Sequence, residues 1–185
     1  MTPSADTPAA PAPAAPPPIP VGEAHALFRF GAHRFALPIN EVQEVVGSLE
    51  ITPVPRAGAG WLGVGNLRGE IVPAATLAPW FPAPPTPPGS SVFYAGKKTA
   101  GSIFLIIQTG SGKLALAADG FEHVTAIPRE AIEPWPADGA ALPPDFVPAR
   151  WQPPGHPQVV GCLDAKRLGA QLRSAVVAAG SELLS

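Results

Sequence analysis

The chain has 185 residues and a net charge of −2, so it lacks the broad positive field that holds nucleic acid or an anionic membrane surface. With 27 prolines and 19 glycines it cannot be an all-helical protein. Charged residues make up only 14% of the chain, and this composition leaves apolar surface exposed and favours protein partners.

Residues 1–22 are rich in Pro, Ala and Thr and predict a disordered tail ahead of one ordered domain at 23–180. A second interpretation of residues 15–20 is a PxxP-type ligand. The start of the chain lacks the features of a secretory signal, and no apolar run is long enough to span a bilayer. Cys162 is the single cysteine and fits a reducing compartment. We therefore expect a cytoplasmic protein without direct membrane insertion.

Short apolar runs separated by Gly, Pro and Asn follow the tail, as in small β-barrels rather than a βαβ sheet. The run IFLIIQT is apolar enough to be a central strand. The ten predicted strands cover residues 24–30, 34–39, 49–54, 61–67, 71–75, 91–95, 103–109, 113–118, 121–127 and 159–163.

Between the second and third of these strands, the run EVQEVV places valines at helical spacing. Val42, Val45 and Val46 would share one face, and Asn40 is a candidate N-cap. We expect a short helix that packs against a sheet, because a single turn is unstable alone. Residues 56–60 then form a flexible loop.

The run WLGVGNLRGEIVPAATL, residues 61–77, predicts the hairpin around which the domain is organised. Arg68 stands at its corner, and Gly69 supplies the positive φ that a tight reversal needs. Pro73 confines the second strand to a sheet edge or an irregular segment. An arginine held at such a corner is either a surface for a partner or a solvated turn.

In the second half of the chain, residues 128–133 predict a short turn and residues 137–157 an irregular, proline-rich segment. Asp164 is a candidate N-cap for a closing amphipathic helix. The apolar residues that recur at helical spacing after it are Leu168, Leu172, Val176 and Ala179.

No set of residues has the spacing of a catalytic or metal site. The glycine run from Gly63 does not match GxGxxG and no helix follows it, which argues against a dinucleotide site. Cys162 lies in an apolar run that offers nothing to lower its pKa, so we expect an inert thiol. We expect no enzyme activity, no metal and no cofactor. The histidines have no HxxxH or CxxC companions and lie far apart, at His25, His33, His123 and His156.

A surface argument remains. Val42, Glu44 and Arg68 flank the same predicted sheet and together offer an apolar patch, one acid and one base. A partner helix that binds through spaced apolar anchors and complementary charge would use such a set. The alternative is a small-molecule or glycan-binding β-barrel in which Trp61, Trp80 and the loop tryptophans form stacking platforms.

Several segments resemble the CheW family of chemosensory coupling proteins. They are FxFGxxRFALPINEVQEVV from Phe28, ITPVP from Ile51, WLGVGNLRGEIVP from Trp61, and VVGCLD before the closing helix. The similarity covers nearly all of residues 24–180 and is loose between 82 and 157. The tryptophan before GVGNLRG also resembles the subgroup that serves type IV pilus (twitching) arrays.

The resemblance implies a mostly β fold of two intertwined, five-stranded, SH3-like barrels without catalytic activity. Such proteins bridge the cytoplasmic helical tip of chemoreceptors and the regulatory domain of a CheA-type histidine kinase. By position, Val42, Glu44 and Arg68 match residues that contact the receptor, whereas Asn66 and Gly69 match residues that shape the hairpin. The full predicted partner-binding set is Val42, Glu44, Val45, Asn66, Leu67 and Arg68.

One stretch departs from the family pattern. After GEIVP the family continues into an apolar pair, an acid and a leucine, whereas this chain has Ala74-Ala75-Thr76-Leu77. Thr76 can still cap a helical turn, but it cannot make a partner contact that needs the acid. We therefore expect changed or weakened kinase coupling, as in a divergent accessory copy.

Overall fold

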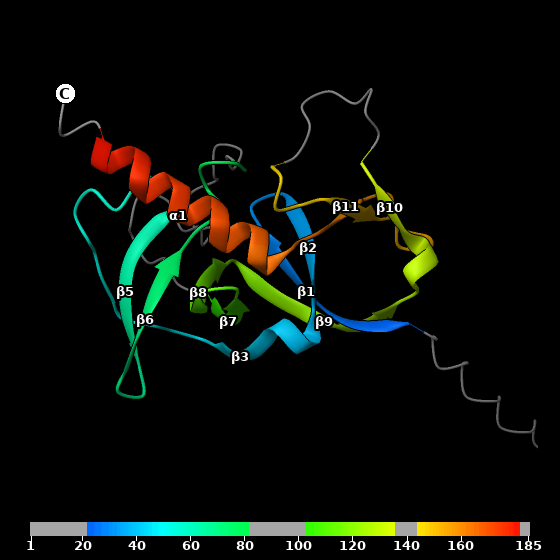
Figure 1. Cartoon of the computed structure of the whole chain (residues 1–185). Coiled ribbons are helices and arrows are strands. Elements are labelled where there is room, and N and C mark those ends of the chain that lie inside the picture. The colour runs from blue at the N-terminus through cyan, green and yellow to red at the C-terminus, as the bar shows by residue number, and fades with distance from the viewer. Residues whose placement is uncertain (1–21, 82–102, 136–143, 182–185) are drawn as a thin grey trace, which may run out of the picture.

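The computed structural model describes residues 22–81, 103–135 and 144–181, so residues 1–21 of the predicted tail and the predicted strand at 91–95 lie outside it. Within these residues the chain is mostly β, with one long helix, α1 (Ala165–Ser181), lying across one side (Figure 1). The strands are β1 (Glu23–Phe30), β2 (His33–Pro38), β3 (Val42–Val46), β4 (Ile51–Thr52), β5 (Trp61–Leu67), β6 (Glu70–Ala75), β7 (Ile103–Thr109), β8 (Gly112–Ala118), β9 (Gly120–Ile127), β10 (Ile132–Pro134), β11 (Ala149–Trp151) and β12 (Val160–Cys162).

The described strands form two sheets of six, where the resemblance implied barrels of five. The terminal sheet has the order β10-β11-β12-β2-β1-β9, so it combines strands from both ends of the described chain. The middle sheet has the order β3-β7-β8-β6-β5-β4 and is built entirely from the segment between β2 and β9. The two sheets are therefore intertwined along the chain.

Each sheet is rolled around a small apolar cluster of its own. In the middle sheet, buried side chains such as Val72 and Phe104 meet in a cluster to which all six strands contribute. In the terminal sheet, Leu27, Ile127 and Val160 belong to a second cluster, again with members from all six strands. Side chains from the two ends of one sheet can meet in this way only if the sheet curls round. The predicted fold of two small β units with a closing helix is confirmed.

One nearly continuous strand crosses from one sheet to the other. β8 ends at Ala118 and β9 begins at Gly120, with only Asp119 between them. The Asp119 N–H donates to the carbonyl of Arg29 at 2.8 Å, and Asp119 Oδ2 accepts the Gly31 N–H at 2.5 Å. Burial raises the pKa of Asp119, although the hydrogen bond from Gly31 opposes this shift. These contacts fix the crossing point to the turn between β1 and β2.

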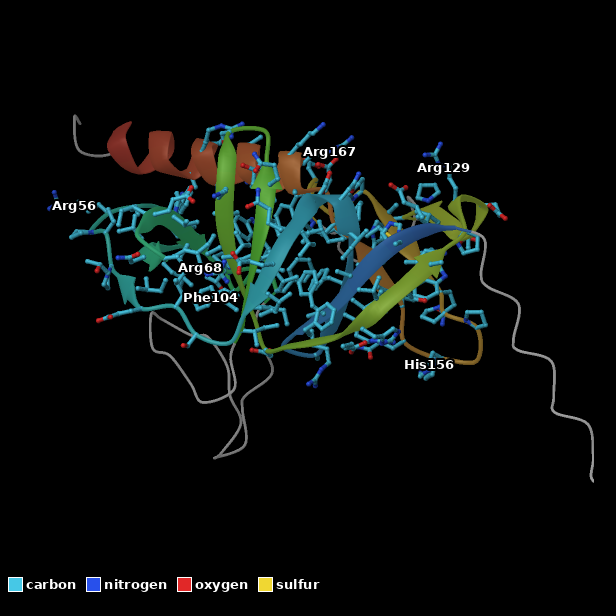
Figure 2. The ribbon with its side chains drawn as sticks, turned by 90° about the horizontal axis from the view of Figure 1, so that it is seen from below. Arg56, Arg68, Phe104, Arg129, His156 and Arg167 are labelled. Carbon is cyan, nitrogen blue, oxygen red and sulfur yellow. The ribbon has the colours of Figure 1, made fainter. Side chains whose placement is uncertain are left out.

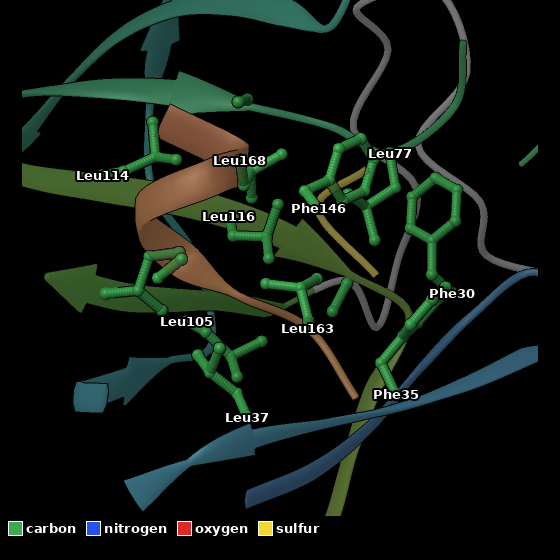
Figure 3. Packing of buried hydrophobic residues seen from close by; sticks show 14 of the residues in the cluster. Phe30, Phe35, Leu37, Leu77, Leu105, Leu114, Leu116, Phe146, Leu163 and Leu168 are labelled. Atoms are coloured by element: carbon green, nitrogen blue, oxygen red, sulfur yellow. The ribbon is translucent and has the colours of Figure 1, made fainter. Parts of the chain in front are cut away.

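The largest core lies between the two sheets and beneath α1, and side chains fill the space there (Figure 2). Figure 3 shows Leu163, which precedes α1, and Leu168 of α1 near Leu105 of β7 and Leu116 of β8. Phe35 from β2 belongs to the same cluster. Burying one such side chain contributes about 1.5–3 kcal/mol. The two sheets therefore cannot separate without exposing a large apolar area.

The closing helix begins as the sequence predicts. Asp164 Oδ1 accepts the N–H of Arg167 at 2.9 Å, so Asp164 is the N-cap. Leu168 and Leu172 are fully buried, which confirms the predicted apolar face over its first half. The indole N–H of Trp61 donates to the Leu172 carbonyl at 3.0 Å and ties the helix to β5.

The helix predicted at residues 41–46 is wrong. A 3₁₀ turn covers only Ile39–Glu41, no side chain caps it, and Val42–Val46 is strand β3. β3 pairs with β7 in the antiparallel sense. The helical spacing of three valines could not distinguish a helix from a strand here. β-Branched side chains favour strands, and the neighbouring strand β7 supplies the backbone hydrogen bonds.

The predicted position of the second hairpin strand at a sheet edge is also wrong. β6 lies between β5 and β8 in the middle sheet. Pro73 is tolerated there because only Ala74 and Ala75 pair with β8, so the proline precedes the shared ladder.

Two further segments contain more structure than the sequence predicts. The irregular, proline-rich segment contains β11, which pairs with β10 and β12. The turn at 128–133 is a 3₁₀ turn at Arg129–Ala131 that leads directly into β10. Both strands have only three residues, too few for an alternation pattern to be visible.

Replacing Gly169 with alanine should destabilise the protein, although alanine in a helix interior is favoured over glycine by about 1 kcal/mol. A Cβ at Gly169 would lie 2.9 Å from the Cβ of buried Thr109, so the helix would have to move away from β7. Overpacking of this kind costs about 1–3 kcal/mol. In thermal unfolding we expect a lower Tm for Gly169→Ala and an unchanged or higher Tm for Ser174→Ala at an exposed position of the same helix. A higher Tm for both would contradict this account of the helix contact.

Cys162 in β12 should react slowly with thiol reagents. Burial raises its pKa from 9.0 to about 11, so the thiolate is about 100-fold scarcer near neutral pH than for an ordinary cysteine. We expect iodoacetamide to label the native chain at least that much more slowly than the chain in denaturant. Because the chain has one cysteine, the same molecule serves as its own control. Equal rates in the two states would show that the thiol is accessible.

Candidate functional site

The hairpin of β5 and β6 ends in a two-residue turn made by Arg68 and Gly69. Leu67 pairs with Glu70 across it, and both turn residues have positive φ, 53° for Arg68 and 91° for Gly69. This is the backbone twist of a tight hairpin reversal. The hairpin prediction is thus confirmed, but the sequence pointed only to glycine for the left-handed conformation. In Figure 1 the tip projects from the body on the side away from α1.

Asn66 supports this turn from inside the hairpin. Its Oδ1 accepts the N–H of Gly69 at 2.7 Å, which satisfies a backbone donor that the reversal leaves without a ladder partner. The backbone of the turn that carries Arg68 is therefore held by the Asn66 hydrogen bond and by the Leu67–Glu70 strand pair.

An ion pair joins the tip of the hairpin to β3. Arg68 Nη2 donates to Glu44 Oε2 at 2.7 Å. The Arg68 side chain is 77% exposed and that of Glu44 is 29% exposed, so the pair lies at the surface (Figure 2). β3 and the hairpin are separated by β7 and β8 in the sheet order, so the pair spans the open end of the rolled middle sheet.

A second ion pair holds the other side of the hairpin. Lys113 on β8 contacts the carboxylate of Glu70, the first residue of β6. Both ion pairs thus lie at the tip end of the hairpin, where Glu70 is tied to β8 and Arg68 to β3. Surface pairs of this kind contribute little stability, about 0–1 kcal/mol each, but two of them restrict the direction in which the tip points.

The structure brings four of the six predicted binding residues together at one end of the middle sheet: Glu44, Asn66, Leu67 and Arg68. Leu67 is half-buried and packs on the cluster inside that sheet. Val45 is adjacent to Glu44 in β3 and is 39% exposed.

Val42 does not join this group. It is half-buried and packs against the large core between the sheets. The prediction that Val42 and Glu44 share a surface with Arg68 relied on a helix. In β3 a shift of register between these two residues places their side chains on different faces.

Sequence reasoning missed Ile71, the most exposed of the large apolar side chains on the described surface, at 64%. It lies on β6, three residues after Arg68, and faces outward while its neighbour Val72 is buried. The available signal was the alternation of side chains along a strand, because adjacent residues such as Ile71 and Val72 face opposite sides and cannot enter the same apolar cluster.

The departure at Ala74-Ala75-Thr76 lies inside the fold. Ala74 and Ala75 are fully buried, and Thr76 is 7% exposed. Thr76 Oγ1 accepts the N–H of Ala78 at 3.2 Å and caps the turn that leads to Trp80. In this chain the position therefore serves the turn and offers little surface to a partner.

The tryptophans proposed as stacking platforms are packed. Trp61 donates to the helix carbonyl at Leu172, and Trp80 meets Phe146 edge-on with ring centroids 5.1 Å apart. Trp151 is 8% exposed. Trp135 is half-buried and lines a surface cavity of about 260 Å³, smaller than the roughly 300–1,000 Å³ of most ligand pockets. The alternative of a glycan-binding barrel finds no platform in these side chains.

Within the described ranges, no group of three His, Cys, Asp or Glu side chains is placed to hold a metal ion. None of the described helices is long and apolar enough to cross a bilayer.

Comparison with known proteins identifies a family for this chain and several relatives. The CheW-like domain model matches residues 25–172. The probable chemotaxis protein CheW of Rhizobium etli is 29% identical over 119 residues, which are 64% of this chain and 70% of that protein. The chemotaxis protein CheW of Klebsiella aerogenes is 25% identical over 127 residues, 69% of this chain and 70% of its own length.

The fold matches a solved structure as well. The crystal structure of the scaffolding protein TtCheW from Thermoanaerobacter tengcongensis superposes with a TM-score of 0.65 at 23% identity, covering 80% of this chain and 92% of that one. The family model spans most of the chain and includes both sheets and the hairpin, so the chain belongs to the CheW-like domain family.

Proposed function

We propose that this protein is a non-catalytic chemosensory adaptor of the cytoplasm. It would couple the cytoplasmic helical tip of a chemoreceptor to the regulatory domain of a CheA-type histidine kinase. The observation that carries the proposal is the exposed, braced Arg68 at the hairpin tip of a CheW-like domain. Service in a type IV pilus array stays a prediction from the sequence around Trp61.

The tip offers chemistry that suits a helical partner. A guanidinium has five N–H donors in a fixed plane, and that of Arg68 remains largely exposed while it contacts Glu44. Arg68 can therefore donate to an acceptor on the partner while it keeps its contact with the Glu44 carboxylate. Val45 and Ile71 are themselves exposed on the same sheet, although Val45 faces the opposite side of β3 from Glu44. Exposed apolar anchors together with a directional charge are the usual means of fixing a helix on a surface.

An adaptor needs room for two partners. The middle sheet carries Val45 and Ile71, and the terminal sheet carries a separate exposed pair, Phe121 and Val124 on edge strand β9. Because the sheets share one core, partners on the two units would be held at a fixed relative position. Co-purification of the chain with both a receptor fragment and a kinase regulatory domain tests the proposal directly, and failure to form either binary complex would reject it.

Arg68→Ala should weaken receptor binding and leave the fold intact. Removing one partner of a desolvated charge contact costs about 2 kcal/mol or more, a rise in Kd of about 30-fold. The loss of fold stability should be small, because the pair with Glu44 is surface-exposed. Calorimetric titration against a receptor cytoplasmic fragment measures the first effect and thermal unfolding the second.

Arg56→Ala is the matched control for this variant. Arg56 is also exposed and also has positive φ, at 59°, but it lies in the loop between β4 and β5. Equal affinities for the two variants would show that the tip arginine has no special role.

Ile71→Ser should also reduce receptor affinity, by about 1–2 kcal/mol for an apolar anchor that becomes buried on binding. It should not lower the Tm, because the side chain is already exposed in the free protein. Val124→Ser, an exposed apolar residue on the terminal sheet, should leave the same receptor affinity unchanged. A binding isotherm for Ile71→Ser that overlies the wild type would exclude β6 from the contact.

A further inference from the structure

We propose that Gln43 is a positioning residue that turns the Glu44 carboxylate toward Arg68. Gln43 does so as the extra residue of a β-bulge in β3. The importance of Glu44 to a partner rests on the proposed function, but its orientation toward Arg68 is a property of the free protein and can be tested there.

The pairing of β3 with β7 contains one residue too many. Val42 lies opposite Ile107 and Glu44 lies opposite Ile106, with the register shift between them. No residue of β7 therefore pairs with Gln43 in the ladder. Two residues against one is the signature of a β-bulge, which bends the strand and redirects the side chains that follow.

The bulge places Glu44 on the face of β3 from which its carboxylate contacts Arg68. Ile107 belongs to the large core between the sheets, whereas Ile106 belongs to the cluster inside the middle sheet. Residues paired across strands share a face, so Val42 and Glu44 lie on opposite faces although they are two residues apart. A regular strand would put them on the same face.

A regular ladder shows what the bulge prevents. With Gln43 opposite Ile106, Glu44 would take the place that Val45 now has opposite Leu105. Its carboxylate would then leave the side of β3 from which it contacts Arg68. Arg68 would also lose its partner at the open end of the middle sheet.

A side-chain hydrogen bond holds the extra residue in place. Gln43 Nε2 donates to Gln108 Oε1 at 2.8 Å. Gln108 Nε2 donates in turn to the carbonyl of Thr109 at 3.3 Å, which fixes the direction of its amide. The bulged residue is thus attached through its side chain to β7.

Cross-linking between engineered cysteines measures this orientation without a partner. In a Cys162→Ser background, Glu44→Cys with Arg68→Cys should react with a short bis-maleimide about tenfold faster than Val45→Cys with Arg68→Cys, because residues 44 and 45 face opposite sides. Gln43→Ala and Gln108→Ala should each reduce the ratio of these two cross-linking rates about threefold, because each removes the side-chain hydrogen bond that holds the bulge in place. Gln171→Ala, which removes an exposed glutamine from α1, should leave it unchanged.

Deletion of Gln43, unlike its replacement by alanine, should leave the cross-linking ratio unchanged. Without the extra residue a regular ladder keeps Val42 opposite Ile107 and Glu44 opposite Ile106, so the cross-linking ratio should stay near that of the parent.

The proposed role of Gln43 is overturned if Gln43→Ala and Gln108→Ala leave the cross-linking ratio unchanged, whatever their effect on the Tm. Receptor titration separates the two proposals: normal ratios with no receptor binding by the wild-type chain would reject the adaptor function and keep the positioning role.

Discussion

The apolar core shared by the two sheets and α1 is the constraint on which the rest of the structure depends. Neither sheet is complete as a folding unit, since each has a small cluster inside and a second apolar face that only the other sheet and the helix can cover. The strand that runs through Asp119 adds a covalent connection at the same place. Apolar burial therefore makes one rigid body of two small rolled sheets.

Rigidity of this kind matters for the hairpin tip. A single exposed ion pair such as Arg68 with Glu44 is too weak to hold a loop in one place. Here the pair acts on a tip already fixed by the Asn66 hydrogen bond and by β5 and β6 inside the sheet. The charges therefore set a direction while the core supplies the stiffness.

The sequence predicted those parts of the fold that local chemistry determines. The hairpin at Arg68-Gly69, the buried run of β7 and the Asp164 cap all follow from residues within a few positions of one another. The β3 segment was misassigned because valines at 42, 45 and 46 satisfy both a helix and a bulged strand, and only β7, some sixty positions later, decides between them.

The candidate site was predictable to the same degree. Arg68 could be found from its turn, and Glu44 from its charge among valines. The separation of Val42 from Glu44 could not, because it depends on the register of β3 against β7. Ile71 was overlooked because a strand interior rich in apolar residues gives no sign of which face another sheet will cover.

The order of strands in the terminal sheet has a consequence for synthesis of the chain. β1 and β2 come early in the chain, yet parallel β12, which pairs with β2, and the helix that shares a core with Phe35 come much later. The middle sheet can close once β8 has left the ribosome, whereas β2 has only β1 beside it until β12 follows, and the core that both strands share with α1 stays open until then. During that interval their apolar faces need shelter, so a nascent chain of this topology is a natural client for a chaperone that binds early and releases late.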